Sequence, residues 1–373
     1  MDAPDTHSEH MREALALAER GLGHVSPNPM VGALVVDASD TVLGRGWYAG
    51  PRGAPHAEVL ALRAAGDRAR GATVYCSLEP CDHHASTPPC TDALIAAGVA
   101  RVVVAAGDPN PLVDGRGLKH LRDAGIDVID GVLAKEAHRL NAAFERHITT
   151  GLPFVVWKIA ASLDGKTAAH DGTSQWITSP EARADAHRLR AWSDAIVVGA
   201  GTVLADDPRL TVRGPELAEA RRPTRVVVDS RGRVAPSAAV FDEDAPTLVA
   251  TTDRAPDARV RAWETAGAEV LVLDADVSGG VSPTALLAAL GKRDVQGLLL
   301  EGGAALAWSF LRDGAIDRIV QYIAPVIVGG AAAHGVVAGL GFAPIEHARR
   351  VSYRRIDRIG PDLRVEADVH RDR

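Results

Sequence analysis

The stretch from His56 to Cys90 limits what this chain can fold into more than any other part of the sequence. It opens with His56-Ala57-Glu58, continues with Glu79-Pro80-Cys81 and closes with Pro88-Pro89-Cys90. One imidazole and two thiolates give zinc three protein ligands and leave the fourth tetrahedral position open, as a catalytic zinc site requires. Glu58 is then free to move protons. We therefore expect a fold that brings His56, Cys81 and Cys90 together and places Glu58 beside them.

A closed structural zinc site is the alternative, and it needs a fourth ligand. The candidates are Cys76, His83 and His84. Cys76 lies inside a predicted strand, where a cysteine usually packs like a small apolar residue. A histidine as fourth ligand would leave Glu58 without an evident task. The order His-x-Glu, Pro-Cys and a second Cys is instead the signature of zinc-dependent deaminases of nucleobases.

The hydrophobic pattern places the three ligands at the ends of predicted elements. We expect a helix from His56 to about Ala65, a strand over 73–78 that delivers Cys81, and a helix opened by Pro88-Pro89 that carries Cys90. Further strands are predicted over 31–36, 41–47, 101–106 and 126–129, and further helices over 11–22, 117–124 and 133–148. The alternation of strands and helices predicts an α/β domain with a central sheet.

A turn-like stretch near 149–153 separates a second region, so we expect one domain over 1–150 and another over 151–373. A capping box of Thr178 and Glu181 predicts a helix that ends near Trp192. Helices are also predicted over 283–290 and from 304 to Leu311. Strands are predicted over 154–161, 194–198, 225–229, 247–250, 269–273, 297–300, 318–328, 351–359 and 363–369.

Two junctions of a strand, glycines and a helix are candidates for binding a phosphate. Gly199-Ala200-Gly201 has the wrong spacing for the dinucleotide-binding fingerprint, and Asp206-Asp207-Pro208 cuts short the helix that the fingerprint requires. Asp229, at a strand end, is only loosely placed as its ribose-binding acid. The second junction is Glu301-Gly302-Gly303, where backbone amides can approach a phosphate. A tight turn explains each glycine pair equally well, so a Rossmann domain is disfavoured.

The composition excludes several classes of protein. A net charge of −7 argues against a protein built to coat nucleic acid, and three cysteines are too few for a disulfide framework. No apolar run approaches the ~20 residues of a membrane span, and the polar first ten residues predict no secretory signal. We therefore expect a cytoplasmic protein with no nucleic-acid or membrane partner.

Two other functions are consistent with the zinc motif. A deaminase that edits nucleic acid would need basic and aromatic surface, but aromatic residues make up only 4% of the chain. A non-catalytic zinc-stabilised binding protein, with a nucleotide sensor in its second half, would have no need of Glu58 next to His56.

Longer motifs resemble the bifunctional deaminase/reductase of riboflavin biosynthesis. "SPNPMVGALVV", "HAEVLAL", "SLEPCDHHASTPPC", "DALIAAGVARVVVA" and "DPNP" resemble its deaminase half, and "KIAASLDGKTA", "SQWITSPEAR", "GTVLADDPRLTVR", "VVVDS" and "LLLEGGAAL" resemble its reductase half. Eight residues separate Cys81 from Cys90, and this long gap is typical of the branch of zinc deaminases to which that enzyme belongs. Members often carry Ser-His-His-Gly-Arg after the first cysteine, where this chain has Asp82 to Ser86. The arginine of that run, one possible phosphate or substrate contact, is missing here.

The resemblance implies a cytidine-deaminase-like domain with zinc, a dihydrofolate-reductase-like domain with NADPH, and a homo-oligomer, either a dimer through the reductase domain or a tetramer. It implies deamination of 2,5-diamino-6-ribosylamino-4(3H)-pyrimidinone 5′-phosphate, followed by reduction of its ribosyl group to ribityl. The implied substrate contacts are Asn28, Ser174, Arg190, Leu210, Arg213 and Glu301. The implied cofactor contacts are Ala160, Trp176, Thr202, Asp206, Ser230 and the run from Gly303. Two interpretations of Arg231 stay open: it binds the 2′-phosphate of NADPH, or it is a solvated turn residue. Lys158 and Asp206 are the candidates for handling protons.

Overall fold

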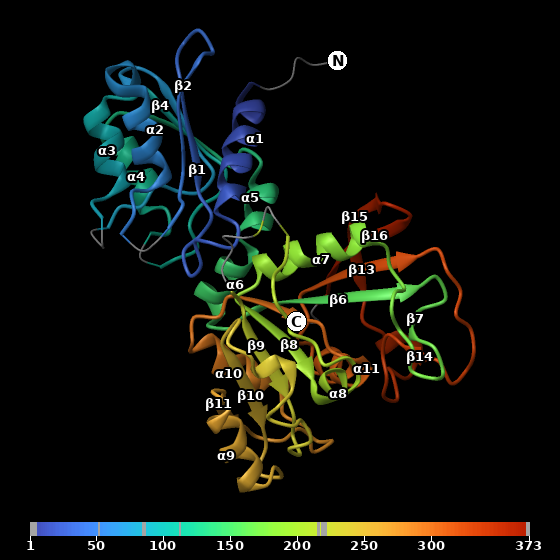
Figure 1. Ribbon diagram of the computed structural model, residues 1–373. Helices are drawn as coiled ribbons and strands as arrows, with labels where there is room; N and C mark the ends of the chain where they lie inside the picture. Colours follow the sequence, from blue (N-terminus) through green and yellow to red (C-terminus); the bar gives the residue numbers. More distant parts are fainter. Residues whose placement is uncertain are drawn as a thin grey trace. The chain divides into compact units, whose positions relative to one another are not determined.

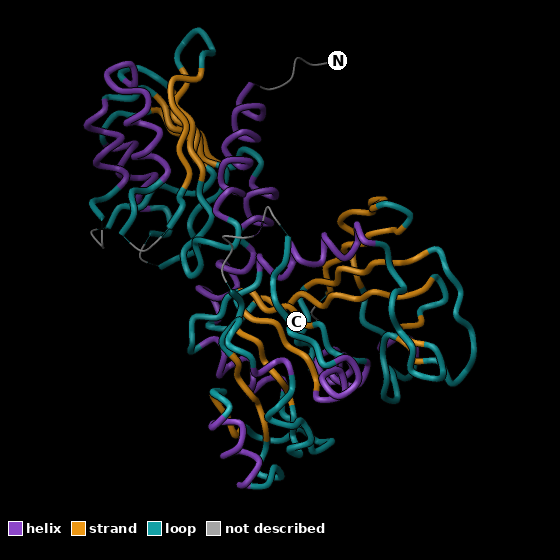
Figure 2. The backbone as a smooth tube through the Cα atoms, viewed as in Figure 1, coloured by secondary structure: helices purple, strands orange, loops and turns teal. Residues whose placement is uncertain are grey.

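Each half of the chain is built around one β-sheet in the computed structural model (Figures 1 and 2). The structure describes residues 6–50, 53–83, 87–111, 113–214, 217 and 222–370. It divides into two units, Met1–Gly151 and Leu152–Arg373. None of the helices in the described part of the chain has the length and hydrophobicity of a membrane span.

The first unit has a five-stranded sheet between helices. Its strands are β1 (Gly32–Val36), β2 (Val42–Trp47), β3 (Thr73–Cys76), β4 (Arg101–Val104) and β5 (Asp127–Asp130). Its helices are α1 (Thr6–Ala18), α2 (Ala57–Ala65), α3 (Cys90–Ala97), α4 (Arg116–Asp123), α5 (Ala134–Leu140) and α6 (Ala142–Thr150). The strand order is β2-β1-β3-β4-β5, with β3, β4 and β5 parallel.

Alternation along the strands gives the sheet two apolar faces. Ala33, Val35 and Val74 pack against α2, α3 and α4, whereas Leu34 and Tyr75 pack against α1 and α5. These helices cover opposite faces of the sheet (Figure 1). The face under α2 and α3 therefore carries the elements that hold the predicted zinc ligands.

Two glycines bring α2 unusually close to β2. A Cβ atom on Gly44 would lie 2.1 Å from the carbonyl oxygen of Ala61, and one on Gly46 would lie 2.1 Å from that of Ala57. Real Cβ atoms do not approach backbone this closely, so only glycine lets helix and strand meet in this way. The contact fixes the position of α2 relative to the sheet, and thereby the positions of His56 and Glu58.

The helix predicted over 133–148 is wrong in one respect, because the structure has two helices there. They meet at Asn141, whose side chain accepts from the backbone N–H of Met30 at 2.8 Å and donates to its carbonyl oxygen at 2.9 Å. Asn141 is buried, and its φ of −101° and ψ of 18° interrupt the helix. The first helix is also shorter than predicted, since α1 ends at Ala18, before Leu22.

The second unit has a nine-stranded sheet in which seven neighbouring strands are parallel. Its strands are β6 (Phe154–Ser162), β8 (Ala195–Gly199), β9 (Thr224–Val228), β10 (Thr247–Thr251), β11 (Glu269–Val272), β12 (Gly297–Leu300), β13 (Arg318–Ala324), β15 (Val351–Ile359) and β16 (Asp362–Val369). Their order is β11-β10-β9-β8-β12-β6-β13-β16-β15, and the last two strands are antiparallel. A separate pair is formed by β7 (Lys166–Ala168) and β14 (His334–Gly335).

Helices cover both faces of this larger sheet. They are α7 (Pro180–Trp192), α8 (Ala200–Asp206), α9 (Asp257–Thr265), α10 (Pro283–Gly291) and α11 (Ala304–Arg312). The apolar side chains of α7, α8 and α9 pack on one face, and those of α10 and α11 pack on the other. The carboxyl ends of the parallel strands carry Gly199, Ser230 and Glu301, which puts the predicted cofactor and substrate residues at one edge of the sheet.

Two predictions for this unit need correction, and several elements were missed. The residue that caps α7 is Ser179, whose hydroxyl accepts from the N–H of Ala182 at 3.2 Å, and not Thr178. The strand predicted over 318–328 ends at Ala324, because the N–H of Val328 donates to Asp164 instead of extending the sheet. The helix α9 and the strands β7 and β14 were not predicted at all.

Candidate active sites

The structure brings the three predicted zinc ligands of the first unit together. His56 is the residue before α2, Cys81 follows β3, and Cys90 is the first residue of α3. Nδ1 of His56 lies 3.1 Å from Sγ of Cys90 and 3.5 Å from Sγ of Cys81. These three ligand atoms all lie within 4.8 Å of one another. One nitrogen and two sulfur atoms at this spacing fit zinc, with a fourth position left for water or substrate.

The ring of His56 is oriented by contacts that the sequence did not reveal. Nε2 of His56 lies 3.3 Å from the hydroxyl of Thr87, so Nε2 can carry the proton while Nδ1 faces the sulfur atoms. The ring of Tyr48 packs edge-on against the imidazole, with centroids 5.8 Å apart. Asn28, a predicted substrate contact, donates to the hydroxyl of Tyr48 at 3.2 Å. Asn28 is thereby linked to the metal site through one side chain.

Glu58 is buried beside the cluster. Its side chain is 3% exposed, and its Oε2 has no hydrogen-bond partner among the described residues. Burial raises the pKa of the Glu58 carboxyl, because the charged form loses its hydration. A buried carboxylate oxygen without a partner is costly unless something binds there. This orphaned oxygen next to one imidazole and two thiols fits a proton-carrying base beside a zinc-bound substrate.

The two thiols of the cluster have different acidities. The contact with Cys90 lowers the pKa of Cys81 to about 4, and the contact with His56 adds to this effect. The same contact with Cys81 raises the pKa of Cys90, as does its burial. The position of Cys90 at the start of α3 favours its thiolate form once a cation is near.

The residues considered for a closed zinc site do not join the cluster in the part of the chain that the structure describes. Cys76 is 0% exposed and packs in the core under α2, as expected for a small apolar side chain. Nδ1 of His83 is buried, with no hydrogen-bond partner among the described residues, and His83 is not part of the metal-binding group. His84, Ala85 and Ser86 lie outside the described residues.

Asp82 joins two helices. Its Oδ1 accepts from the hydroxyl of Thr91 at 2.7 Å and lies 2.6 Å from Nδ1 of His120. Thr91 is the second residue of α3, directly after Cys90, and His120 lies in α4. Asp82 therefore steadies the start of the helix that carries one zinc ligand.

Glu79 is a second residue whose role the sequence did not reveal. Its Oε1 accepts from the backbone N–H groups of Gly117 and Leu118, at 3.0 and 3.3 Å. Its Oε2 accepts from those of Gly115 and Asp108, at 3.1 and 3.3 Å. One buried carboxylate thus satisfies the N-terminus of α4 and fixes the loop that begins with "DPNP".

In the second unit, two predicted substrate contacts bind each other. Nε and Nη2 of Arg190 donate to the two carboxylate oxygens of Glu301, at 2.7 and 2.8 Å. Burial alone would raise the pKa of Glu301, but the guanidinium of Arg190 lowers it to about 2. Burial also lowers the pKa of Lys158, whose ammonium lies close enough to Glu301 for the carboxylate to oppose the shift. These three charges form one cluster at the end of β12.

The backbone around Arg213 is held by a histidine that sequence reasoning missed. Nδ1 of His187 accepts from the N–H of Arg213 at 3.2 Å. Burial lowers the pKa of His187 to about 4, and the positive charges of Arg190 and Arg213 add to the shift. The imidazole is therefore neutral near pH 7, so it adds no positive charge beside Arg213, whereas the charge of Arg190 is paired with Glu301. Leu210, in the same loop, is 3% exposed, and Ser174 is half-buried in the segment before α7.

The predicted cofactor residues lie on several elements at the carboxyl edge of the sheet. Ala160 is in β6, Thr202 and Asp206 are in α8, and Gly303 precedes α11. The hydroxyl of Thr202 would lie 3.6 Å from a Cβ atom on Gly303, so these two positions are adjacent. Burial raises the pKa of Asp206. The described contacts thus join Thr202 to Gly303 but not to Ala160.

Ser230 and Trp176 make other contacts. The hydroxyl of Ser230 accepts from the N–H of Val281 at 2.9 Å. Trp176 is 68% exposed, and its ring stacks with Arg183 at 4.4 Å. Arg231 is exposed in the turn after Ser230.

The carboxylate of Asp229 is used by its own turn, since it accepts from the N–H groups of Val234 and Arg231, at 2.7 and 3.4 Å. Asp229 therefore holds the backbone of its own turn.

Comparison with known proteins accounts for both sites. Residues 153–365 match the model of the RibD C-terminal domain. Residues 4–106 match the model of the cytidine and deoxycytidylate deaminase zinc-binding region. The chain belongs to the RibD family.

Full-length relatives support the same assignment. The riboflavin biosynthesis protein RibD of Escherichia coli is 43% identical over 364 residues, which cover 95% of this chain and 97% of that protein. The RibD protein of Aquifex aeolicus is 42% identical over 356 residues, with coverages of 95% and 96%. A solved structure of Acinetobacter baumannii RibD has a TM-score of 0.85 at 36% identity and covers 98% of this chain and 99% of that one.

As a RibD family member, the chain is an enzyme of riboflavin biosynthesis with a deaminase and a reductase activity. Its cofactors are zinc and NADPH. The predicted fold classes, cytidine-deaminase-like and dihydrofolate-reductase-like, are confirmed. The roles of individual site residues and the division of the activities at residue 150 stay predictions.

Proposed function

We propose that the unit Met1–Gly151 deaminates, and the unit Leu152–Arg373 then reduces, one phosphorylated pyrimidine intermediate. The substrate would be 2,5-diamino-6-ribosylamino-4(3H)-pyrimidinone 5′-phosphate, and the final product 5-amino-6-(5-phosphoribitylamino)uracil. A Thermotoga maritima structure with a TM-score of 0.85 at 34% identity is named as a diaminohydroxyphosphoribosylaminopyrimidine deaminase and 5-amino-6-(5-phosphoribosylamino)uracil reductase. It covers 98% of this chain, which supports the same pair of reactions here.

In the deaminase unit, His56, Cys81 and Cys90 would hold zinc, and Glu58 would be the catalytic base. When bound, zinc supplies a Lewis acid that makes water nucleophilic at neutral pH. Glu58 accepts the first proton of that water on Oε2 and passes it to the ring nitrogen. It then takes the second proton from the hydroxyl group now on the ring carbon and gives it to the departing amine. Water is consumed and ammonia is released. The raised pKa of Glu58 suits a group that must hold a proton between these steps. Asn28 would contact the substrate.

In the reductase unit, the bond between C1′ and the ring oxygen breaks as the oxygen takes up a proton, and the lone pair of the attached amine forms a C1′=N bond. When bound, NADPH would supply a hydride to C1′, which returns these electrons to the nitrogen and leaves an open ribityl chain. Lys158 is our first candidate for the proton donor, because burial lowers the pKa of its ammonium and makes the proton easier to give. Asp206 is the second candidate, since burial raises the pKa of its carboxyl.

The phosphate of the nucleotide would bind beside Arg213, near the neutral His187. Arginine forms bidentate hydrogen bonds with phosphate oxygens, and a neutral imidazole does not compete for them. Arg190 and Glu301 would bind the sugar while they remain hydrogen-bonded to each other. Ser174 and Leu210 would line the sugar-binding site.

For NADPH we propose contacts from both ends of the carboxyl edge. Trp176 offers an aromatic surface to the nicotinamide, and Gly303 offers the amides at the start of α11 to a phosphate. Ala160, Thr202, Asp206 and Ser230 complete the cofactor contacts. Arg231, exposed in the turn after Ser230, would bind the 2′-phosphate.

We also propose that the enzyme is a homo-oligomer and acts in the cytoplasm. Large apolar side chains of the second unit are exposed on or near its edge strand β15, including Ile345, Tyr353 and Ile356, at 85%, 71% and 58%. A second copy covering this surface gives a dimer through the reductase unit, from which a tetramer can form. The cysteines are free, and the two metal-binding thiols need a reducing compartment.

The proposal rests on the orphaned Oε2 of Glu58 beside the ligand atoms of His56, Cys81 and Cys90. To test it, the purified protein is given the diaminopyrimidine nucleotide with and without NADPH. Ammonia release and loss of NADPH absorbance are followed separately. Ammonia should appear in both samples and absorbance should fall only after deamination. Absorbance loss without ammonia, or turnover of a transfer RNA in place of the nucleotide, would reject the proposed order and substrate.

A further inference from the structure

A buried arginine lies beneath the loop that carries two of the proposed substrate contacts. Arg225 is the second residue of β9, and it is 0% exposed. Side chains alternate along a strand, so Arg225 faces the same side of the sheet as Val227, which packs in one apolar cluster with Leu210. A charge in such a place is unfavourable unless it is paired and hydrogen-bonded. The partners of Arg225 therefore indicate its role.

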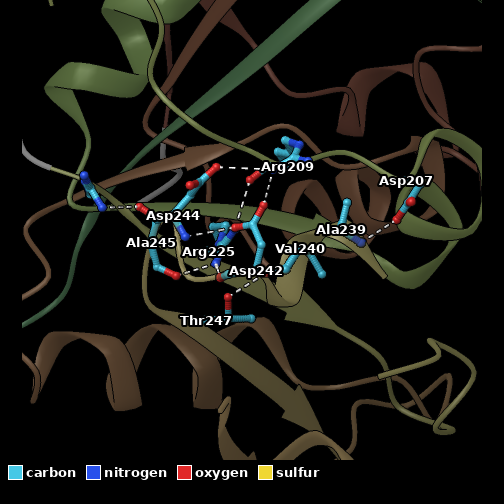
Figure 3. A network of polar contacts seen from close by, with 10 residues as sticks. Asp207, Arg209, Arg225, Ala239, Val240, Asp242, Asp244, Ala245 and Thr247 are labelled. Atoms are coloured by element: carbon cyan, nitrogen blue, oxygen red, sulfur yellow. Dashed lines mark hydrogen bonds and ion pairs between the residues drawn. The ribbon is translucent and has the colours of Figure 1, made fainter. Parts of the chain in front are cut away.

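The guanidinium of Arg225 makes four hydrogen bonds to two separate loops (Figure 3). Nη1 donates to Oδ1 of Asp242 at 2.6 Å and to the carbonyl oxygen of Arg209 at 3.3 Å. Nη2 donates to the carbonyl oxygens of Asp242 and Ala245. Arg209 lies in the loop after α8, whereas Asp242 and Ala245 follow the short helical turn Ala239–Phe241.

Two further contacts join the same loops. Nη1 of Arg209 forms an ion pair with Oδ2 of Asp242 at 2.7 Å, so one carboxylate bridges both arginines. Oδ1 of Asp207 accepts from the N–H of Ala239 at 2.7 Å. The segment 207–209 is thereby held through the Asp207 carboxylate, the Arg209 guanidinium and the Arg209 carbonyl.

The backbone of this loop requires such support. Asp207 has a φ of 40° and Leu210 a φ of 52°, in the left-handed region that residues with a side chain rarely adopt. Such conformations persist only where the surrounding contacts impose them. The tethers to Arg225 and Asp242 lie between these two residues in the sequence, so they are placed to impose this shape.

The shape of the loop sets the positions of groups in the reductase site. Directly after Leu210, the carbonyl oxygen of Thr211 accepts from Nη1 of Arg190 at 2.9 Å. Two residues later, the N–H of Arg213 donates to His187. A change in the path of the loop at Arg209 would therefore displace the proposed phosphate contact and one support of Arg190.

We infer that Arg225 is a positioning residue for the nucleotide-binding half of the reductase site. Among the described residues its guanidinium hydrogen-bonds to neither Leu210 nor Arg213, and it acts through the carbonyl oxygen of Arg209 and the carboxylate of Asp242. The inference rests on the proposed function, in which Leu210 and Arg213 bind the nucleotide. Lysine cannot replace Arg225, because a single ammonium has no planar fork to span two loops.

The test compares Arg225→Lys with Leu286→Ala in the full-length enzyme. Leu286 is 1% exposed in α10 and packs on the opposite face of the sheet, so its loss creates a cavity without touching the loop. We expect Arg225→Lys to raise the reductase KM for the deaminated nucleotide about tenfold, with kcat and the KM for NADPH within about twofold of wild type. Leu286→Ala should lower the Tm without this change in KM. Hydrogen exchange in a peptide spanning 207–213 should be faster in Arg225→Lys alone.

An unchanged nucleotide KM in a folded Arg225→Lys, or a KM for NADPH that rises equally, overturns the inference. If Arg225→Lys does not fold, Asp242→Asn decides, because it keeps Arg225 and removes the carboxylate that bridges it to Arg209. The same selective rise in KM supports the inference, and its absence overturns it. Arg213→Ala in the same assay separates failure of the inference from failure of the proposed nucleotide site. If Arg213→Ala raises the nucleotide KM and Arg225→Lys does not, only the positioning role is rejected. No response to Arg213→Ala rejects the proposed nucleotide site and the inference with it.

Discussion

The guanidinium of Arg190 meets both carboxylate oxygens of Glu301, at 2.7 and 2.8 Å, although the two residues are 111 positions apart in the sequence. Their side chains are only 15% and 9% exposed. Removing one member of such a pair leaves the other charge buried and unpaired, which is more damaging than replacing both.

Glu301→Gln should therefore destabilise the second unit by about 3 kcal/mol. The pKa of Glu301 lies near 2 in the folded protein, below its ordinary value of 4.5, so the folded state favours the charged form. The stabilisation is present above pH 4.5 and is lost as the pH falls toward 2. Urea unfolding of wild type should show this acid-side loss, and Glu301→Gln should lack most of it. A variant with an identical pH profile would mean that Glu301 does not contribute through its charge.

Glu58→Gln should lower the deaminase kcat by about 10²- to 10⁴-fold, because the amide cannot accept the proton of water. Zinc content and the reduction of deaminated substrate should stay at wild-type values. Metal analysis, ammonia release and NADPH oxidation measure the three quantities. Glu136→Gln makes the same chemical change on an exposed position of α5 and should alter none of them. Loss of zinc in Glu58→Gln would show that Glu58 is a ligand.

Arg213→Ala should raise the reductase KM for the nucleotide by about 10- to 100-fold, which corresponds to one charged hydrogen bond to phosphate. The KM for NADPH and the deaminase activity should not change. Arg261→Ala removes an exposed arginine of α9 and provides the matched control. If the nucleotide KM stays at its wild-type value, Arg213 does not belong to the phosphate site.

Glu79→Gln should destabilise the first unit by about 1–3 kcal/mol, because an amide nitrogen would face backbone N–H groups that now meet a carboxylate oxygen. Deaminase activity should fall with the stability, whereas reductase activity should not. Thermal unfolding followed together with ammonia release tests this. A variant with wild-type stability would show that the four backbone contacts of Glu79 are replaceable by water.

The zinc ligands were predictable because each lies at the end of an element with a clear local pattern. His56 and Cys90 begin helices, Cys81 follows a strand, and the short elements between them leave little freedom. The break at Asn141 was not predictable, because its cause is Met30, 111 positions earlier. Local patterns describe only neighbours within a few turns.

The roles of two polar residues, Glu79 and His187, were not predictable for the same reason. Glu79 and His187 are ordinary polar residues in the sequence, and their partners come from other segments. Arg225 contradicts the strand pattern outright, since an apolar residue is expected at an inward-facing position of β9. Only the loops that meet above it explain the exception.

The glycines of β2 carry a consequence for genetics. A growth screen in cells that depend on this enzyme for riboflavin would score Gly44→Ala and Gly46→Ala as severely as loss of a zinc ligand, since a single methyl group would collide with the backbone of α2. Neither glycine is among the proposed zinc or substrate contacts. Intolerance to mutation at these positions would reflect the short distance between the backbones of β2 and α2. A map of essential residues would then include both glycines together with His56, although neither has a proposed catalytic role.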